Sequence, residues 1–136
     1  MVKRYIAVLD GMVEGEGLVN LPLAKVSTRE AGWRMVGDID GKAGGKAART
    51  RWRAIAVRGE RTLVEFTPET GRTHQLRVHA AEGLGVPIAG DPVYGRGGPA
   101  MMLHAAFLLL PRAGKPPAEA EAPLPPRFAH LGFSAA

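Results

Sequence analysis

Residues 48–68 of this 136-residue chain contain two runs of alternating side chains separated by a short turn. Before the turn at residues 59–60, Trp52 and other small or apolar residues alternate with arginines. After the turn, Val64 and Phe66 occupy alternate positions. A period of two is typical of strands with one buried face, and two such runs joined by a Gly-containing turn predict a β-hairpin. The fold must therefore accommodate a long antiparallel pair.

The remaining regular elements are weaker but consistent with one sheet. Short runs rich in β-branched and apolar residues predict strands at 3–11, 34–41 and 101–111, and residues 15–23 are expected to form a loop and a short extended piece. The continuous apolar run of 101–111 predicts a strand buried on both faces. At Gly71–Gly83 the period changes to a helical one, which predicts a helix over 73–83.

The other segments lack a periodic pattern. Residues 24–34 are polar and unpatterned, 41–46 form a flexible turn, and 111–127 hold many Pro, Ala and Glu residues typical of a surface crossing. This order of elements predicts an α+β fold with a mostly antiparallel sheet and one main helix. The length predicts a single domain over residues 1–136.

Composition excludes several classes of protein. The chain has no Cys, which excludes disulfide scaffolds, Cys-ligated zinc and thiol catalysis. The net charge of +5 favours a polyanionic partner such as nucleic acid. No apolar run reaches membrane-spanning length and no signal peptide is evident, so the expected location is the cytoplasm, without a membrane partner.

Three other kinds of chemistry find little support. His74 and His79 are five positions apart, about 140° around a helix, which favours two separately hydrogen-bonded histidines over a metal site. Ser27 and Ser134 lack a nucleophile-elbow context. The segment 41–50 lacks the Walker spacing and is better explained as a basic turn. We therefore expect no metal site.

The cluster from Arg72 to His79 is the strongest candidate site. Arg72 lies near the predicted helix start, where its charge opposes the helix dipole, so we expect it to serve a partner or a carboxylate. Arg77 lies among apolar residues and needs an acid if it is partly buried. Two interpretations of Arg77 stay open: a structural salt bridge, for example to Asp91, or an arginine that holds a catalytic carboxylate.

Three motifs in this order resemble the C-terminal half of the RluA-type pseudouridine synthases: "TGRTHQLRVH", "GVPIAGDPVYG" and "LHAAFLLLP". The stretch "KRYIAVLDG" is similar to the Lys-x-Tyr strand of that family. "GLVNLPL", "GKAARTRW" and "APLPPRF" also lie where the family has similar stretches. The resemblance covers nearly the whole chain.

The resemblance implies an isomerase that converts uridine to pseudouridine in ribosomal or transfer RNA without a cofactor. In this family an Asp carboxylate acts on a flipped uridine, the N-glycosidic bond breaks, the uracil turns, and a C–C bond forms. Such chemistry requires base extrusion into a pocket, a positioned carboxylate and a basic surface for the RNA backbone.

The same resemblance implies roles for individual residues. Tyr5 would pack on the target base, Arg77 would pair with the catalytic Asp, and Leu103 would form an apolar wall of the pocket. The site or its RNA-facing edge would be lined by Arg72, His74 and Gln75. Asp91 and Tyr94 would order a loop and take no part in the chemistry.

One part of the family pattern is absent from this sequence. The resemblance implies a catalytic Asp in a His-Arg-Leu-Asp segment before the Lys-x-Tyr strand, whereas this sequence starts at that strand, and neither Asp10 nor Asp91 is its equivalent. Three alternatives follow: a C-terminal part of a synthase, a non-catalytic RNA-binding module, or a structural domain. For the first, we expect a homo-oligomer or a missing N-terminal portion to cover an exposed sheet edge.

Overall fold

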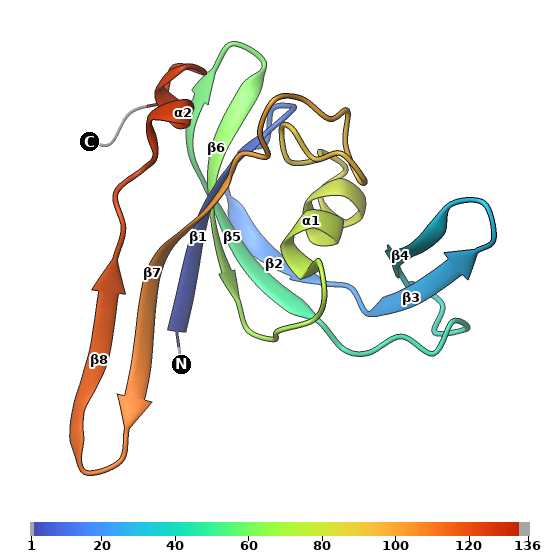
Figure 1. Ribbon diagram of the computed structural model, residues 1–136, viewed down its shortest axis with the longest axis horizontal. Helices are drawn as coiled ribbons and strands as arrows, with labels where there is room; N and C mark the ends of the chain where they lie inside the picture. Colours follow the sequence, from blue (N-terminus) through green and yellow to red (C-terminus); the bar gives the residue numbers. More distant parts are fainter. Residues whose placement is uncertain (1, 134–136) are drawn as a thin grey trace.

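The computed structural model describes residues 2–133, which form a six-stranded sheet and a separate two-stranded sheet (Figure 1). The larger sheet has the order β2-β5-β6-β1-β7-β8, and all neighbouring strands are antiparallel. Its strands are β1 (Val2–Leu9), β2 (Glu16–Asn20), β5 (Arg49–Arg58), β6 (Arg61–Pro68), β7 (Leu103–Arg112) and β8 (Lys115–Glu121). The predicted α+β fold with a mostly antiparallel sheet is confirmed.

β5 and β6 form the predicted hairpin. Their register places Trp52 opposite Phe66 and Ala54 opposite Val64. Val64 and Phe66 are fully buried, and Trp52 packs against the same core. A register shift between Ala54 and Ala56 marks a bulge, which increases the local twist of the sheet. The alternation in the sequence therefore identifies the face of the sheet that carries the core.

The helical segment lies across one face of the larger sheet (Figure 1). It consists of α1 (Gln75–Val78) followed by one π-helical turn, η1 (His79–Gly83). The predicted helix is confirmed, although it starts two residues later than residue 73. The reason is His74, whose φ of 54° is left-handed and incompatible with the α-helix. Apolar side chains from both turns join the core formed with β1 and β6.

β3 (Leu23–Thr28) and β4 (Gly32–Gly37) form the two-stranded sheet, which projects beside the helix (Figure 1). The interpretation of 24–34 as unpatterned was wrong, because these residues form a regular hairpin. Only the base of the hairpin is buried, where Leu23 and Met35 pack against the helix. The rest is largely exposed, so hydrophobic alternation does not mark these strands.

β7 and β8 form a long hairpin at the other side of the sheet (Figure 1). The prediction that β7 is buried on both faces was wrong: Leu108 and Leu110 are 37% and 42% exposed. The predicted surface crossing of 111–127 was also wrong, since it contains β8. β8 is an edge strand, and an edge strand tolerates residues such as Pro116 and Pro117. An apolar run in the sequence is therefore not sufficient to predict that both faces of a strand are covered by another layer.

The helices are short. α2 (Pro126–Ala129) follows β8 and places the fully buried Phe128 in the main core. Pro126 occupies the first helical position, where its missing N–H carries no penalty. Over residues 2–133, no helix has the length and apolar character needed to cross a bilayer.

Candidate functional site

A cavity of about 270 Å³ opens between β1, the segment leading into α1, and the start of β7. All six site residues expected from the sequence line it: Tyr5, Arg72, His74, Gln75, Arg77 and Leu103. The lining is completed by Lys3, Pro68, Thr70, Gly71 and Leu76. The fold therefore brings together three stretches of chain that are far apart in sequence.

The lining combines flat or apolar side chains with cations. Tyr5 and Leu103 contribute the apolar part, while Lys3 and Arg72 contribute positive charge. No Asp or Glu is among these lining residues. Such a cavity suits a planar group attached to an anion, because the ring can stack while the cations neutralise the charge.

Strand geometry positions the apolar side of the cavity. Lys3 and Tyr5 are two residues apart on β1, so their side chains lie on one face of the sheet. Leu103 pairs with Ala7, which continues the same alternation. Tyr5 is itself fixed between Phe66 of β6 and β7. The ring of Tyr5 and the side chain of Leu103 are therefore held by the sheet and not by a loop.

Gln75 holds the loop that carries Arg72. Its Oε1 accepts hydrogen bonds from the Thr70 hydroxyl (2.7 Å) and the Arg72 backbone N–H (3.0 Å). Its Nε2 donates to the Arg49 carbonyl (2.9 Å) and to the Thr50 hydroxyl (3.0 Å). These four bonds use the full capacity of the amide. Gln75 thus lines the cavity, but its polar atoms position the neighbouring chain.

Arg72 is an exposed residue that lines the cavity with its positively charged side chain. Its Nε donates to the carbonyl of Ala47 (2.9 Å), which anchors the side chain. Among the ion pairs of residues 2–133, none involves Arg72. This arrangement leaves the charge of Arg72 available to a ligand. It is consistent with the expectation that Arg72 contacts a partner and does not stabilise the helix.

His74 is held in place from two sides. Its Nδ1 lies 2.8 Å from the hydroxyl of Tyr94, and its ring stacks on Trp33 with centroids 5.2 Å apart. The Tyr94 hydroxyl already accepts the N–H of Met35, so its own proton can be donated to His74. Burial, and then the charge of Arg77, lower the pKa of His74 below its ordinary value. The ring is therefore a neutral side chain of the cavity at neutral pH.

Arg77 forms a two-point ion pair with Asp91. Nε and Nη2 lie 2.9 and 2.8 Å from the two carboxylate oxygens. Asp91 is fully buried and also accepts the backbone N–H groups of Val93 and Tyr94, so it orders the loop. Burial alone would raise the pKa of Asp91, but these hydrogen bonds outweigh it and keep the pKa below its ordinary value. Of the two interpretations left open for Arg77, the salt bridge is the one formed within this chain.

The two histidines of the helical segment are separately hydrogen-bonded. His79 is fully buried, with Nδ1 2.7 Å from the Thr50 hydroxyl and Nε2 2.8 Å from the Leu21 carbonyl. Desolvation by burial lowers its pKa, although the bond to Leu21 opposes this. In the described part of the chain no cluster of His, Asp and Glu has the grouping of a metal site. His79 therefore has a structural role.

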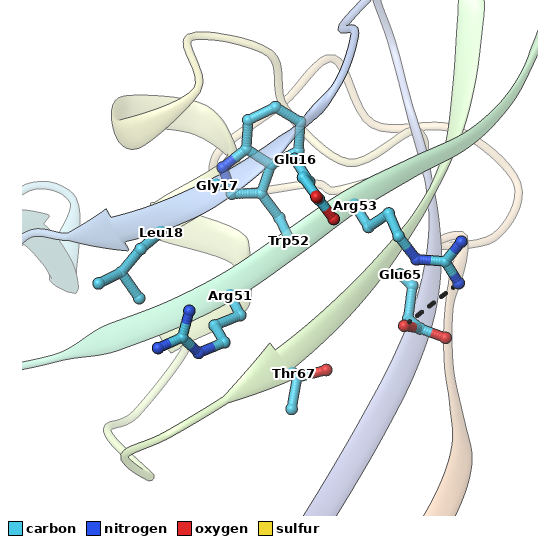
Figure 2. Close-up of a pocket in the computed structure, with 8 residues that line it drawn as sticks. All are labelled: Glu16, Gly17, Leu18, Arg51, Trp52, Arg53, Glu65 and Thr67. Atoms are coloured by element: carbon cyan, nitrogen blue, oxygen red, sulfur yellow. Dashed lines mark ion pairs between the residues drawn. The ribbon is translucent and has the colours of Figure 1, made fainter.

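A larger groove of about 460 Å³ lies elsewhere, over β2, β5 and β6 (Figure 2). Its arginines already have acidic partners. Arg53 pairs with Glu65 at 3.5 Å, and Arg51 pairs with Glu69. Because its charges are compensated internally, this groove offers less to an anionic ligand than the smaller cavity at Tyr5.

The family of this chain is shown by its similarity to known proteins. Residues 1–82 match the model of the RNA pseudouridylate synthase family. This chain belongs to that family. An uncharacterized RNA pseudouridine synthase of Zymomonas mobilis is 52% identical over 136 residues, covering 96% of this chain and 60% of that protein. Ribosomal large subunit pseudouridine synthase D of Nitrosomonas europaea is 39% identical over 112 residues, covering 82% of this chain and 30% of that protein.

Solved structures of the family agree with the fold. Human RNA pseudouridylate synthase domain containing 1 matches with a TM-score of 0.76 and 30% identity. The match covers 96% of this chain and 57% of the human one. The resemblance to pseudouridine synthases is thus confirmed. This chain spans 60% or less of the length of each of these relatives.

Sequence reasoning missed several residues of the site. Lys3 lies two positions before Tyr5, so strand alternation could have placed it on the same face. Trp33, which stacks on His74, had no such signal, and the resemblance gave Tyr94 a role in its loop but no contact with His74. Trp33 reaches His74 from the β3–β4 hairpin, and Tyr94 reaches it from the loop that Asp91 orders.

Proposed function

We propose that this chain forms the nucleotide-binding part of a cytoplasmic enzyme that isomerises uridine to pseudouridine in ribosomal or transfer RNA. The observation that carries the proposal is the cavity in which all the family-matched residues meet, Tyr5 and Arg72 among them. Its apolar walls and cationic rim suit an extruded uridine and its phosphates. Names of relatives that specify ribosomal or transfer RNA support the substrate class.

Each side of the cavity has a part in this chemistry. The uracil would stack on Tyr5 and pack against Leu103, while Arg72 and Lys3 hold the phosphates. A carboxylate then acts on the uridine, the N1–C1′ bond breaks, and the uracil turns within the pocket. A C5–C1′ bond forms, and the proton lost from C5 is balanced by one gained at N1. A tight pocket retains the free uracil between these steps.

The carboxylate must come from outside the cavity lining. Arg77 reaches the cavity, but its Nε and Nη2 are committed to Asp91. We propose that a further protein segment supplies the aspartate. Lys3 pairs with Leu108, so the exposed apolar face of β7 continues the face that bears the cavity. A segment packed on Leu108 and Leu110 would lie beside the site.

Pseudouridine formation on RNA from cells lacking the native enzyme tests this function. The chain would be assayed alone and joined at its N-terminus to a family segment that contains His-Arg-Leu-Asp. We expect activity only in the joined protein, and loss of activity when the Asp of that segment becomes Asn. Activity of the chain alone would overturn this assignment, and Asp10 and Asp91 would then be the first residues to replace.

A non-catalytic RNA-binding module is the second candidate function. The observation in its favour is the Arg77–Asp91 pair, which leaves the arginine already neutralised. In this case the joined protein would be inactive, while RNA affinity would fall steeply with salt and with Arg72→Ala. A purely structural domain would show neither activity nor salt-sensitive RNA binding.

A further inference from the structure

A second cavity, of about 480 Å³, meets the first at Gly71 and Arg72, which line both. Its walls are β3 and β4, the loop 43–46 and the segment that leads into α1. The two cavities therefore share one cationic boundary. A ligand that fills the first cavity passes the second as it continues along the surface.

Three cations line the second cavity, and no acidic residue does. Lys25, Lys46 and Arg72 contribute to the lining, and no Asp or Glu does. None of these three takes part in an ion pair among residues 2–133. The groove over β5 differs in this respect, because Arg53 is paired with Glu65 (Figure 2) and Arg51 with Glu69. Uncompensated positive charge in a concave surface attracts a polyanion.

The loop that carries Lys46 is held rigidly. Asp38 is 4% exposed and accepts the backbone N–H groups of Gly45 (2.7 Å) and Ala43 (3.1 Å). A Cβ on Gly45 would lie 2.6 Å from the Asp38 carboxylate. Lys46 also exchanges two backbone hydrogen bonds with Leu23, of 2.8 and 2.9 Å. The lysine is therefore presented by a fixed backbone.

An exposed aromatic ring lies beside these cations. Trp33 is 46% exposed and stacks on His74, which lines the first cavity. The ammonium of Lys25 lies 4.8 Å from the centre of the Trp33 ring. Cations that follow a backbone, next to aromatic rings on which bases stack, are the features of sites for single-stranded nucleic acid.

We propose that the second cavity binds the backbone of an unpaired RNA strand whose extruded uridine occupies the first cavity. Lys46 and Arg72 neutralise the phosphates. His74 stacks on the Trp33 ring and the Lys25 ammonium lies over it. On binding, Lys25 therefore moves to a phosphate, and a base next to the uridine stacks on Trp33 in its place. This inference rests on the proposed function, since it takes RNA as the ligand of the first cavity. It adds the path of the strand and the requirement that the strand be unpaired.

Binding of a short fluorescein-labelled oligouridylate to the full chain, followed by anisotropy at several salt concentrations, tests the proposal. Each phosphate contact to a single strand contributes about 0.7 to the slope of log K against log salt. This slope is negative, so Lys25→Gln with Lys46→Gln should reduce its magnitude by about 1.4. Lys115→Gln, an exposed lysine of β8, is the matched control and should leave the slope unchanged. Equal slopes for the double variant and the control would overturn the proposal.

The stacking contact has its own test. Trp33→Ala should weaken binding about tenfold, as expected for one stacked base, while Trp33→Phe should restore most of the affinity. Ile39→Ala removes a side chain that is 87% exposed and should have no effect. A fully paired RNA duplex should compete poorly. Strong competition by the duplex, or equal affinity of the Trp33→Ala and wild-type chains, would contradict an unpaired strand at this ring.

These measurements need no catalysis, so the two proposals can fail separately. An active joined protein, together with the same salt slope for the double lysine variant and the Lys115→Gln control, would show that the RNA does not pass through the second cavity. The proposed function would then stand. An inactive joined protein, together with the expected salt slopes and the expected loss of affinity in Trp33→Ala, would refute the isomerase function. It would still support RNA binding in the second cavity.

Discussion

Thr50 and His79 are both fully buried and are joined by a hydrogen bond between their side chains. The Thr50 hydroxyl lies between His79 Nδ1 (2.7 Å) and Gln75 Nε2 (3.0 Å), and His79 Nε2 reaches the Leu21 carbonyl. Since His79 Nε2 donates to a carbonyl, Nδ1 accepts the threonine proton. Every polar atom of this network has a partner, which is the condition for burying it.

Replacing Thr50 with Val should therefore destabilise the fold by about 1–3 kcal/mol. The substitution keeps the shape but leaves His79 Nδ1 and Gln75 Nε2 without this partner. Urea denaturation measures the loss. Thr73→Val, at an exposed position, is the control and should change the free energy of unfolding by less than about 0.5 kcal/mol. Equal effects of the two substitutions would contradict a cooperative network.

The same histidine makes stability depend on pH. The folded pKa of His79, like that of His74, lies below its ordinary value, so the unfolded chain binds protons more readily. Their stabilisation is complete above about pH 6.5 and is lost as the pH falls through the folded pKa values. The urea concentration at the midpoint of unfolding should therefore decrease as the pH is lowered from 8 to 5. The decrease should be smaller in His79→Gln, and an unchanged slope would contradict the assignment.

Arg77 and Asp91 form the most buried ion pair described in the chain, with side chains 14% and 0% exposed. Arg77→Met should cost about 3–5 kcal/mol, because it leaves a buried carboxylate unpaired. Arg53→Met removes the exposed partner of Glu65 and should cost no more than about 1 kcal/mol. Urea denaturation of both variants provides the comparison. A loss for Arg77→Met as small as that for Arg53→Met would show that the pair is solvated.

At the scale of elements, the loop between η1 and β7 fastens the site to the sheet. Its backbone bonds to β1 through Ala89 N–H to the Val8 carbonyl (2.8 Å) and Val8 N–H to the Met102 carbonyl (3.0 Å). Asp91, the partner of Arg77, lies between these two anchors. The loop passes closely over itself at Gly90, where a Cβ would lie 1.9 Å from the Ala100 carbonyl oxygen.

Gly90→Ala should consequently be more destabilising than Gly97→Ala. Both glycines have positive φ, of 80° and 73°, which costs an alanine about 1–2 kcal/mol. Only Gly90 also faces a backbone clash; the nearest atom to a Cβ at Gly97 is 4.0 Å away. Thermal or urea unfolding should rank Gly90→Ala well below Gly97→Ala in stability. The reverse order would mean that the close approach at Ala100 relaxes readily.

At the scale of the whole molecule, β7 presents an apolar face and β8 a protected edge. Pro116, Pro117 and the charged residues of β8 disfavour addition of another strand. Leu108 and Leu110, by contrast, are exposed on the neighbouring strand. We therefore expect a partner or a further segment to cover the exposed apolar face of β7, and not the edge of the sheet.

We expect the isolated chain to associate through this face, because association removes apolar surface from water. Light scattering should detect a dimer or larger assembly. Leu108→Lys with Leu110→Lys should shift it to monomer, whereas Ile55→Lys, another exposed apolar position, should not. A strictly monomeric wild-type chain in dilute solution would contradict this prediction.

The elements that could be predicted from the sequence are those with a strong local pattern. The β5–β6 hairpin has strict alternation, and the helical segment after Gly71 has a clear change of period. β3 and β8 could not be predicted in this way, and the strand predicted at 34–41 only overlaps the end of β4. The β3–β4 hairpin and β8 are both largely exposed, so their pairing rests on backbone hydrogen bonds that any side chain permits.

By itself the sequence determined the β5–β6 hairpin, the helical segment and the motifs whose resemblance points to the family and to six of the residues that line the candidate cavity. Local period and motifs are properties of the chain alone. Tertiary structure decided which carboxylate Arg77 contacts, since Asp91 reaches it only through the loop pinned to β1. It also decided that Trp33 stacks on His74 and that two cavities meet at Arg72. Contacts between distant segments depend on how the whole core closes, and no local pattern records that.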